Sequence, residues 1–148
     1  MKVCLTCSAG GHLSEMLQLQ SFFKQFDYFF VTFKRPDTDF LAKTEKVFFV
    51  ERPARNPVKT IQCFWQAWKI IQREKPDLII STGADVTVPI CLAGKLLGKK
   101  IVFIESFCRP TKPSVSGQLA YRFSDLFIYQ WKPLEKFYSR GKFGGSIF

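Results

Sequence analysis

Short apolar runs alternate with helix-like stretches along this chain, and that alternation limits the possible folds more than any other feature. Strands are expected at residues 2–7, 28–33, 46–50, 78–81, 100–104 and 126–129. The runs Leu78–Ile80 and Ile101–Ile104 are apolar without interruption, which indicates strands covered on both faces, as in a parallel sheet. The sequence therefore predicts a doubly wound α/β fold with right-handed crossovers and the strand order 3-2-1-4-5.

Length and composition favour a single globular domain over residues 1–148. The hydrophobic content of 47%, with 17 phenylalanines, supplies enough apolar surface for a core and excludes a disordered chain. No apolar stretch approaches the roughly 18 residues that a membrane-spanning helix needs, and the N-terminus lacks the pattern of a secretory signal. We therefore expect a cytoplasmic protein.

Cysteine usage indicates neither a disulfide framework nor a metal site. The five cysteines are an odd number and lie scattered along the chain. Cys4 and Cys7 match the C-x-x-C pattern, but their odd separation within a strand directs the two side chains to opposite faces of a sheet. We expect reduced, mostly buried thiols, with no metal and no cofactor.

The formal net charge of +10 points to nucleic acid, anionic lipid or a phosphorylated substrate as partners. The basic residues are dispersed, however, and the chain has neither a basic tail nor the helix or aromatic platform of a nucleic-acid-binding motif. Nucleic acid is therefore not expected as a partner. A soluble basic surface without a specific anionic partner remains the alternative.

The stretch that begins at Pro57 carries an unusually aromatic helical stripe. Proline favours the first position of a helix, and the apolar residues that follow recur at helical spacing. The stripe consists of Ile61, Phe64, Trp65, Trp68 and Ile71. Burial against the core explains such spacing, whereas contact of Trp65 or Trp68 with a membrane interface is the alternative, because basic residues lie nearby.

A pair of glycines and the only histidine directly follow the first predicted strand. Gly10, Gly11 and His12 stand between this strand and an amphipathic stretch in which a helix begins. Adjacent glycines let the backbone approach a ligand closely, and the N–H groups of a new helix favour an anion. His12 brings a titratable group to the same point, as a general base towards a hydroxyl, as a phosphate contact or as a helix cap.

Two further polar loops follow the buried strands at 78–81 and 100–104. The residues singled out in them are Ser81, Thr82, Gly83 and Asp85 in the first loop, and Glu105, Ser106 and Arg109 in the second. Asp85 is expected to cap a helix that ends before Gly98. In the predicted sheet the first and fourth strands are neighbours, and ligands bind where the crossovers change direction between them. The three loops should therefore flank one pocket.

Two roles are open for Glu105. Its carboxylate would accept hydrogen bonds from the hydroxyls of a substrate, or it would bind Arg109 across the loop. Carboxylates at strand ends are often structural, and the residue types alone do not separate these two roles.

The order and spacing of the three loops resemble a known family. The motifs are Ser8-Ala9-Gly10-Gly11-His12, Ser81-Thr82-Gly83-Ala84-Asp85 with Pro89, and Glu105-Ser106-Phe107-Cys108-Arg109. These motifs resemble those of the asparagine-linked-glycosylation-fourteen family, in its bacterial polysaccharide-biosynthesis branch. The resemblance extends over nearly the whole chain. The chain is similar, more distantly, to the N-terminal half of MurG, an N-acetylglucosamine transferase in which a glycine-glycine-histidine loop also follows the first strand.

This resemblance implies half of a GT-B glycosyltransferase. Residues 1–148 would form one Rossmann-like domain on the acceptor side, and a separate partner chain would bind the nucleotide-sugar donor. The heterodimer would transfer a sugar from a UDP-sugar to a polyprenyl-diphosphate-linked saccharide in extracellular or capsular polysaccharide biosynthesis. Because the chain begins almost at its first strand, its contact with the inner face of the plasma membrane is expected to be peripheral.

The resemblance also assigns roles to the residues of the three loops. His12 and Glu105 would be catalytic, with His12 as general base or phosphate contact, and the source of the base, this chain or its partner, stays open. The substrate-binding residues would be Gly10, Gly11, Ser81, Thr82, Gly83, Asp85, Ser106 and Arg109.

Two other functions compete with this one. A non-catalytic scaffold would recruit or activate a partner glycosyltransferase at the membrane without supplying a reacting group. An NADPH-dependent reductase would use Lys34 and Arg35 to hold a 2′-phosphate, but the first loop lacks the full G-x-G-x-x-G spacing.

The C-terminal segment Gly144–Phe148 ends in apolar residues that follow two glycines. Such an end has little reason to remain in water, so we expect it to dock. It packs either on this domain or, as the resemblance favours, on the donor-binding partner.

Overall fold

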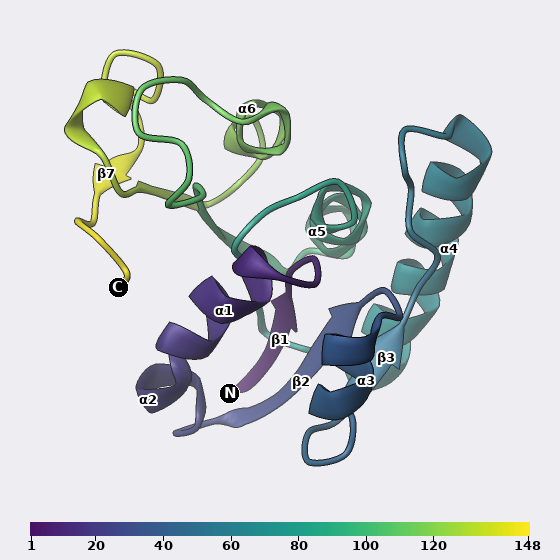
Figure 1. Ribbon diagram of the computed structural model, residues 1–148. Coiled ribbons are helices and arrows are strands. Elements are labelled where there is room, and N and C mark those ends of the chain that lie inside the picture. The colour runs from purple at the N-terminus through teal and green to yellow at the C-terminus, as the bar shows by residue number, and fades with distance from the viewer.

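A computed structural model describes all 148 residues as an α/β domain built on one parallel sheet (Figure 1). The sheet has seven strands in the order β3-β2-β1-β4-β5-β6-β7. The strands are β1 (Lys2–Thr6), β2 (Asp27–Thr32), β3 (Val47–Phe49), β4 (Leu78–Ser81), β5 (Lys100–Ile104), β6 (Leu126–Tyr129) and β7 (Lys142–Phe143). The predicted parallel α/β fold and the order 3-2-1-4-5 are confirmed, and β6 and β7 extend the sheet at one edge.

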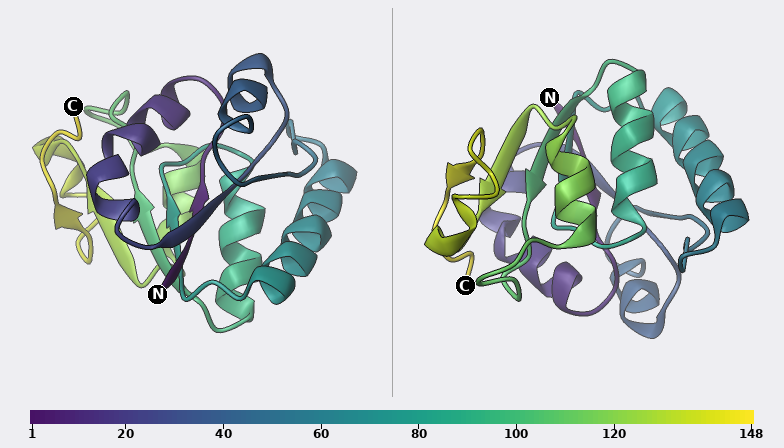
Figure 2. Two further views of the ribbon diagram at one scale, coloured as in Figure 1. Left: turned by 90° about the horizontal axis from the view of Figure 1, so that it is seen from below. Right: turned by 90° about the horizontal axis from the view of Figure 1, so that it is seen from above.

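The helices cover both faces of the sheet (Figure 2). On one face lie α1 (Gly11–Gln18), α2 (Gln20–Phe23) and α3 (Pro36–Leu41). The other face carries α4 (Pro57–Glu74), α5 (Thr87–Leu96) and α6 (Val115–Tyr121), and a 3₁₀ helix, η1 (Lys132–Leu134), follows β6. None of these helices combines the length and the apolar composition that crossing a bilayer would require.

The two faces of the sheet bury separate sets of side chains, because successive strand residues point in opposite directions. Cys4 and Ile79 pack below α4 and α5, whereas Leu5 and Ile80 pack below α1 to α3. Cys7 belongs to the second set, so the two cysteines of the C-x-x-C pattern lie on opposite faces, as predicted. The strands are apolar without interruption because both faces are covered.

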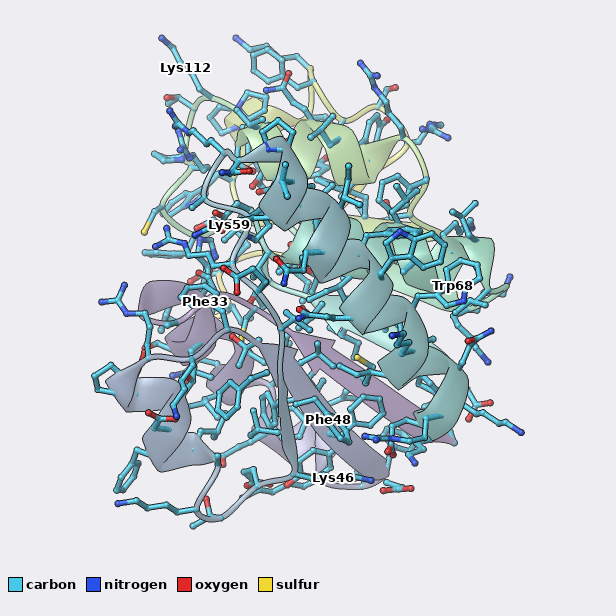
Figure 3. All side chains as sticks on the ribbon, turned by 90° about the vertical axis from the view of Figure 1, so that its right-hand side faces the viewer. Phe33, Lys46, Phe48, Lys59, Trp68 and Lys112 are labelled. Atoms are coloured by element: carbon cyan, nitrogen blue, oxygen red, sulfur yellow. The ribbon has the colours of Figure 1, made fainter.

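Helix α4 begins at Pro57, as predicted, and the Asn56 side chain caps it by accepting the N–H groups of the first turn. Its fully buried residues are Cys63, Ala67 and Ile71. Trp68 lies half-buried against this core (Figure 3), but Trp65, one turn earlier, is 53% exposed. The buried stripe is therefore rotated relative to the predicted one, and only part of the aromatic stripe faces the core.

Edge strand β3 is shielded by cationic side chains. Lys46 Nζ lies 5.5 Å from the centre of the Phe48 ring (Figure 3). Arg73 Cζ lies 4.8 Å from the same ring. Charged groups over an edge strand discourage pairing with another chain.

Candidate functional site

A cleft of about 1280 Å³ opens at the carboxyl ends of β1, β4 and β5, where the strand order reverses. The predicted site residues that line it are Gly11, His12, Asp85, Ser106 and Arg109. The other predicted residues, Gly10, Ser81, Thr82, Gly83 and Glu105, are absent from its wall. The structure therefore brings the three loops to one cleft and divides their residues into a lining layer and a supporting layer.

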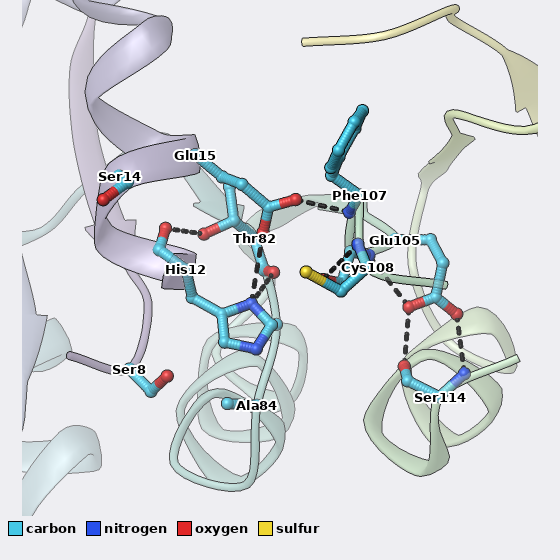
Figure 4. Close-up of polar contacts among 12 residues, drawn as sticks. Ser8, His12, Ser14, Glu15, Thr82, Ala84, Glu105, Phe107, Cys108 and Ser114 are labelled. Atoms are coloured by element: carbon cyan, nitrogen blue, oxygen red, sulfur yellow. Dashed lines mark hydrogen bonds and ion pairs between the residues drawn. The ribbon is translucent and has the colours of Figure 1, made fainter. Parts of the chain in front are cut away.

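His12 occupies the first turn of α1 and is held by a backbone carbonyl (Figure 4). Its Nδ1 atom lies 2.7 Å from the Thr82 carbonyl oxygen. A carbonyl oxygen only accepts hydrogen bonds, so Nδ1 carries the proton and Nε2 holds the lone pair of the neutral ring. Nε2 makes no hydrogen bond within the chain, which leaves it available as a base at the cleft.

The loop after β4 contacts His12 through hydrogen bonds and close packing. Thr82 Oγ1 donates a hydrogen bond of 2.8 Å to the His12 carbonyl, so His12 and Thr82 are joined twice. Gly83 has φ +102°, and a Cβ atom there would lie 3.4 Å from His12 Cε1. The Ser81 hydroxyl accepts the Gly83 N–H at 3.1 Å. Thr82 and Gly83 pack directly against His12, and Ser81 holds Gly83 in place. All three residues are buried, and their contact with a substrate stays a prediction.

The pKa of His12 is set by opposing effects. Burial lowers it, but the contact with Glu15, the hydrogen bond to Thr82 and the negative charges of Glu15 and Glu105 together outweigh burial. The pKa of His12 is therefore raised above its ordinary value, which means that these surroundings stabilise the protonated ring.

The glycine loop leaves the N-terminus of α1 open. Gly10 adopts φ +81°, and its N–H donates to Asp37 Oδ2 at 2.7 Å. The first N–H groups of any helix lack an intrahelical partner, and in α1 no side chain caps them. Gly11, the first helical residue, lines the cleft. Together these features favour an anion beside His12.

Glu105 is buried behind the cleft at the start of the loop after β5. Its carboxylate accepts hydrogen bonds from the N–H group and the hydroxyl of Ser114 (Figure 4). It also accepts the Ser106 N–H and the Tyr138 hydroxyl. A Cβ atom at Gly117 would lie 2.2 Å from Glu105 Oε2, so α6 packs directly on the carboxylate. No ion pair joins Glu105 to Arg109. These hydrogen bonds indicate a structural role for Glu105. A catalytic role, in direct contact with the substrate, stays a prediction that they do not favour.

Asp85 holds the segment before α4 and does not cap α5. Helix α5 begins at Thr87, and its N-cap residue is Val86, without a side-chain cap. Asp85 Oδ2 accepts the Ala54 N–H at 3.2 Å and lies 3.5 Å from Arg52 Nε. The predicted N-cap was wrong because this carboxylate finds a donor on a neighbouring loop.

Two arginines line the cleft without a carboxylate partner. Arg109 comes from the loop after β5, and Arg55 comes from the segment tied to Asp85. Ala54 and Arg55 both have left-handed backbone conformations, with φ of 47° and 58°. Neither arginine forms an ion pair, so both guanidinium groups are available to an anion.

Sequence reasoning missed Glu15 and Arg55. Glu15 lines the cleft although it is only 3% exposed, and its Oε2 atom lies 3.3 Å from His12 Nδ1. The available signal was its place three residues after His12, beside the apolar Met16, which puts a carboxylate on the buried face of α1. For Arg55 the sequence carried no signal, because its place depends on tertiary contacts of the loop.

An apolar groove of about 340 Å³ continues from the cleft between α4 and α5. Thr60, Val88 and Pro89 line both the cleft and the groove. The remaining residues of the groove are Ile61, Phe64, Trp65 and Leu92. Its exposed members Ile61, Trp65 and Leu92 form an apolar surface next to the polar cleft.

The C-terminal segment docks on this domain and also leaves an aromatic side chain exposed. The Ile147 N–H donates to Gln130 Oε1 at 2.8 Å, and the Phe148 ring lies 5.1 Å from the Phe107 ring. Phe148 lines the cleft and is 60% exposed. Docking on this domain is therefore confirmed for the backbone, and packing of the segment on a donor-binding partner stays a prediction.

The arrangement suits chemistry at a hydroxyl next to an anion. His12 Nε2 is a base, while the N-terminus of α1 and the two arginines attract negative charge. Ser106 and Ser116 add hydroxyl groups to the wall. A polar head group fits the cleft, and an apolar extension fits the groove.

Comparison with known proteins places the chain among oligosaccharide biosynthesis proteins. Residues 50–147 match the family model described as "Oligosaccharide biosynthesis protein Alg14 like". The human protein "UDP-N-acetylglucosamine transferase subunit ALG14" is 39% identical over 94 residues, which are 60% of this chain and 44% of the human one. The chain thus spans less than half the length of this curated relative.

Solved structures share the fold at low sequence identity. MurG of Acinetobacter baumannii has a TM-score of 0.74 at 17% identity, covering 88% of this chain and 41% of that one. The UDP-GlcNAc 2-epimerase of Methanocaldococcus jannaschii, in complex with UDP-GlcNAc and UDP, reaches 0.77 at 14% identity, covering 95% and 43%. At these identities the likeness shows the fold alone.

Proposed function

Because the chain belongs to the Alg14-like family of oligosaccharide biosynthesis proteins, we propose that it is the acceptor-binding subunit of a two-chain glycosyltransferase. A partner chain binds the UDP-sugar, and this chain presents a polyprenyl-diphosphate-linked saccharide to it. The family match and the name of the human relative, a transferase subunit, support this proposal. The expected product pathway is extracellular or capsular polysaccharide biosynthesis.

One observation carries the assignment of the acceptor to this chain: a basic, anion-attracting cleft continues into an apolar groove. A lipid-linked diphosphate sugar has the same order of parts. Its diphosphate suits the N-terminus of α1, Arg55 and Arg109, its sugar suits the region around His12, and its first isoprene units suit the groove. The donor would enter beside Phe148, which lines the cleft and is exposed.

In the proposed reaction His12 acts as the general base. Its Nε2 atom removes the proton from an acceptor hydroxyl while that oxygen attacks the anomeric carbon of the donor sugar. The bond between the sugar and the diphosphate breaks, and UDP leaves with the electron pair. Since the hydrogen bond of Nδ1 to Thr82 fixes the tautomer, no rearrangement of the ring precedes the proton transfer.

Direct titration of the isolated chain tests this function. We expect it to bind a soluble analogue in which a sugar is linked through a diphosphate to a short isoprenoid, and not to bind UDP-N-acetylglucosamine. Replacing Arg109 by Ala should weaken binding of the analogue about tenfold, because hydrogen bonds to charged groups contribute at least that much. Lys112→Ala is the matched control, since Lys112 is an exposed cation of the same loop outside the cleft wall. Equal losses in the two variants would remove Arg109 from the site.

The apolar surface of the groove between α4 and α5 is also proposed to touch the membrane, from the cytoplasmic side. We expect the chain to sediment with vesicles of phosphatidylglycerol and phosphatidylcholine at low salt, and to be released near ~1 M salt, where the Debye length falls to about 3 Å. Trp65→Ser should reduce binding at low salt, whereas Phe40→Ser, a change of a 69% exposed aromatic on the opposite face, should not. Equal effects of both substitutions would show that the groove has no special part in membrane contact.

A non-catalytic scaffold is the second candidate. It is favoured by the distribution of contacts around Glu105, which contribute to structure rather than to the cleft. The open Nε2 atom of His12 argues against it, because a scaffold has no need of an oriented base.

A further inference from the structure

Glu15 is the one acidic residue that is both buried and part of the cleft wall. A carboxylate is rarely buried without partners, since removing a charge from water is costly. Only one of its two carboxylate oxygens accepts hydrogen bonds. Oε1 accepts the Phe107 N–H and lies 3.3 Å from Gln130 Nε2, whereas Oε2 makes no hydrogen bond.

The free oxygen of Glu15 faces the imidazole of His12. Oε2 lies 3.3 Å from His12 Nδ1, and the Nδ1–H bond itself points at the Thr82 carbonyl (Figure 4). In the neutral state the contact is therefore close but is not a hydrogen bond. Once the ring becomes positively charged, the carboxylate lies within ion-pair distance of it, in a buried setting that solvent screens little.

We propose that Glu15 is a positioning residue for His12, which keeps Nε2 turned towards the cleft and stabilises the imidazolium that forms when His12 takes a proton. The second part rests on the proposed function, in which that proton comes from the acceptor hydroxyl. The first part concerns this chain alone. Oε1 anchors the carboxylate to the loop after β5 and to Gln130 at the end of β6, so Oε2 is held in place.

Other charged groups near the ring contribute less or face elsewhere. Asp85, Arg55 and Arg109 lie on the cleft walls, and Asp85 is engaged by Ala54 and Arg52. Glu105 also raises the pKa of His12, but it acts only through its charge, without contact. Glu15 is thus the only carboxylate in contact with the ring.

The test uses the fact that His12 is the only histidine of the chain. Its ring resonances in an NMR titration need no assignment, and no partner, donor or acceptor is required. We expect Glu15→Gln to lower the pKa of His12, because the substitution removes the neighbouring negative charge but keeps the shape of the side chain. Glu51→Gln is the matched control, since Glu51 lies outside the cleft wall and pairs with Lys59. An unchanged pKa of His12 in Glu15→Gln would overturn the proposal.

A second variant covers the case in which Glu15→Gln does not fold. Glu15→Asp keeps the charge but withdraws it by one methylene, so the pKa of His12 should fall by a smaller amount. A pKa of His12 equal to that of the unsubstituted chain would again contradict the proposal. In the assembled transferase, Glu15→Gln should reduce kcat about tenfold with little change in the KM for the acceptor, and shift the acid limb of the pH profile to lower pH. If the pKa of His12 shifted but sugar transfer did not change, the contact between Glu15 and His12 would be supported. The proposed role of His12 as general base would then be contradicted.

Discussion

Replacing His12 by Ala is expected to reduce turnover of the assembled transferase by roughly 100-fold or more, the usual scale for loss of a general base. The reason is geometric. His12 Nε2 is the only imidazole nitrogen of the chain that is free of hydrogen bonds, and its tautomer is fixed from the other side by Thr82. Steady-state rates with a soluble acceptor, together with co-purification of the partner, measure the effect and the integrity of the complex.

His12→Gln is the companion variant, because glutamine keeps a donor for the Thr82 carbonyl but cannot act as a base. We expect a loss of similar size. The pH profile adds an independent check. The pKa of His12 is raised above the ordinary 6.5, so the base is protonated, and activity falls, at a higher pH than for an unperturbed histidine. This acid limb should be absent from both variants. Unchanged turnover would demote His12 to a structural role and favour a scaffold.

Much of the fold was predictable because the strands carry their own signal. The uninterrupted apolar runs at β4 and β5 reflect burial on both faces, and the predicted bounds of these strands agree with the observed ones. Helices α3 and α6 and strand β7 were not predicted. Each has at most seven residues, too few for a helical or alternating pattern to be recognised without tertiary contacts.

The site was predictable at the level of loops but not at the level of individual contacts. Strand order alone brings the loops after β1, β4 and β5 to one edge of the sheet. Which side chains then reach the cleft depends on packing. Hydrogen bonds from Ser114 and Tyr138 hold the Glu105 carboxylate outside the cleft wall. Glu15 lies on a helix face whose sequence pattern indicates burial, and yet it lines the cleft.

The aromatic stripe of α4 illustrates the same limit. Spacing identifies a helix face, but not the angle at which the helix meets its neighbours. Cys63, Ala67 and Ile71 are the buried residues of α4, and Trp65 is left over the groove beside α5. Of the predicted stripe only Ile71 is fully buried, whereas Ile61 and Trp65 are exposed.

Omission of the partner should have the largest effect of all. This chain forms one α/β domain, and the exposed Phe148 lines its cleft. If the donor is bound by the partner, neither chain holds both substrates. We therefore expect each chain alone to be inactive, because catalysis requires the acceptor hydroxyl and the donor sugar to be held in contact.

Reconstitution from separately purified chains tests the central claim most directly. The proposed partner would be identified as a protein that co-purifies with this chain from its native cell. The assay supplies a UDP-sugar and a soluble diphosphate-linked acceptor. Sugar transfer in the mixture, with none above background from either chain alone, is the predicted result. Transfer by this chain alone, at a rate comparable with that of the mixture, would contradict the assignment of this chain as an acceptor-binding half.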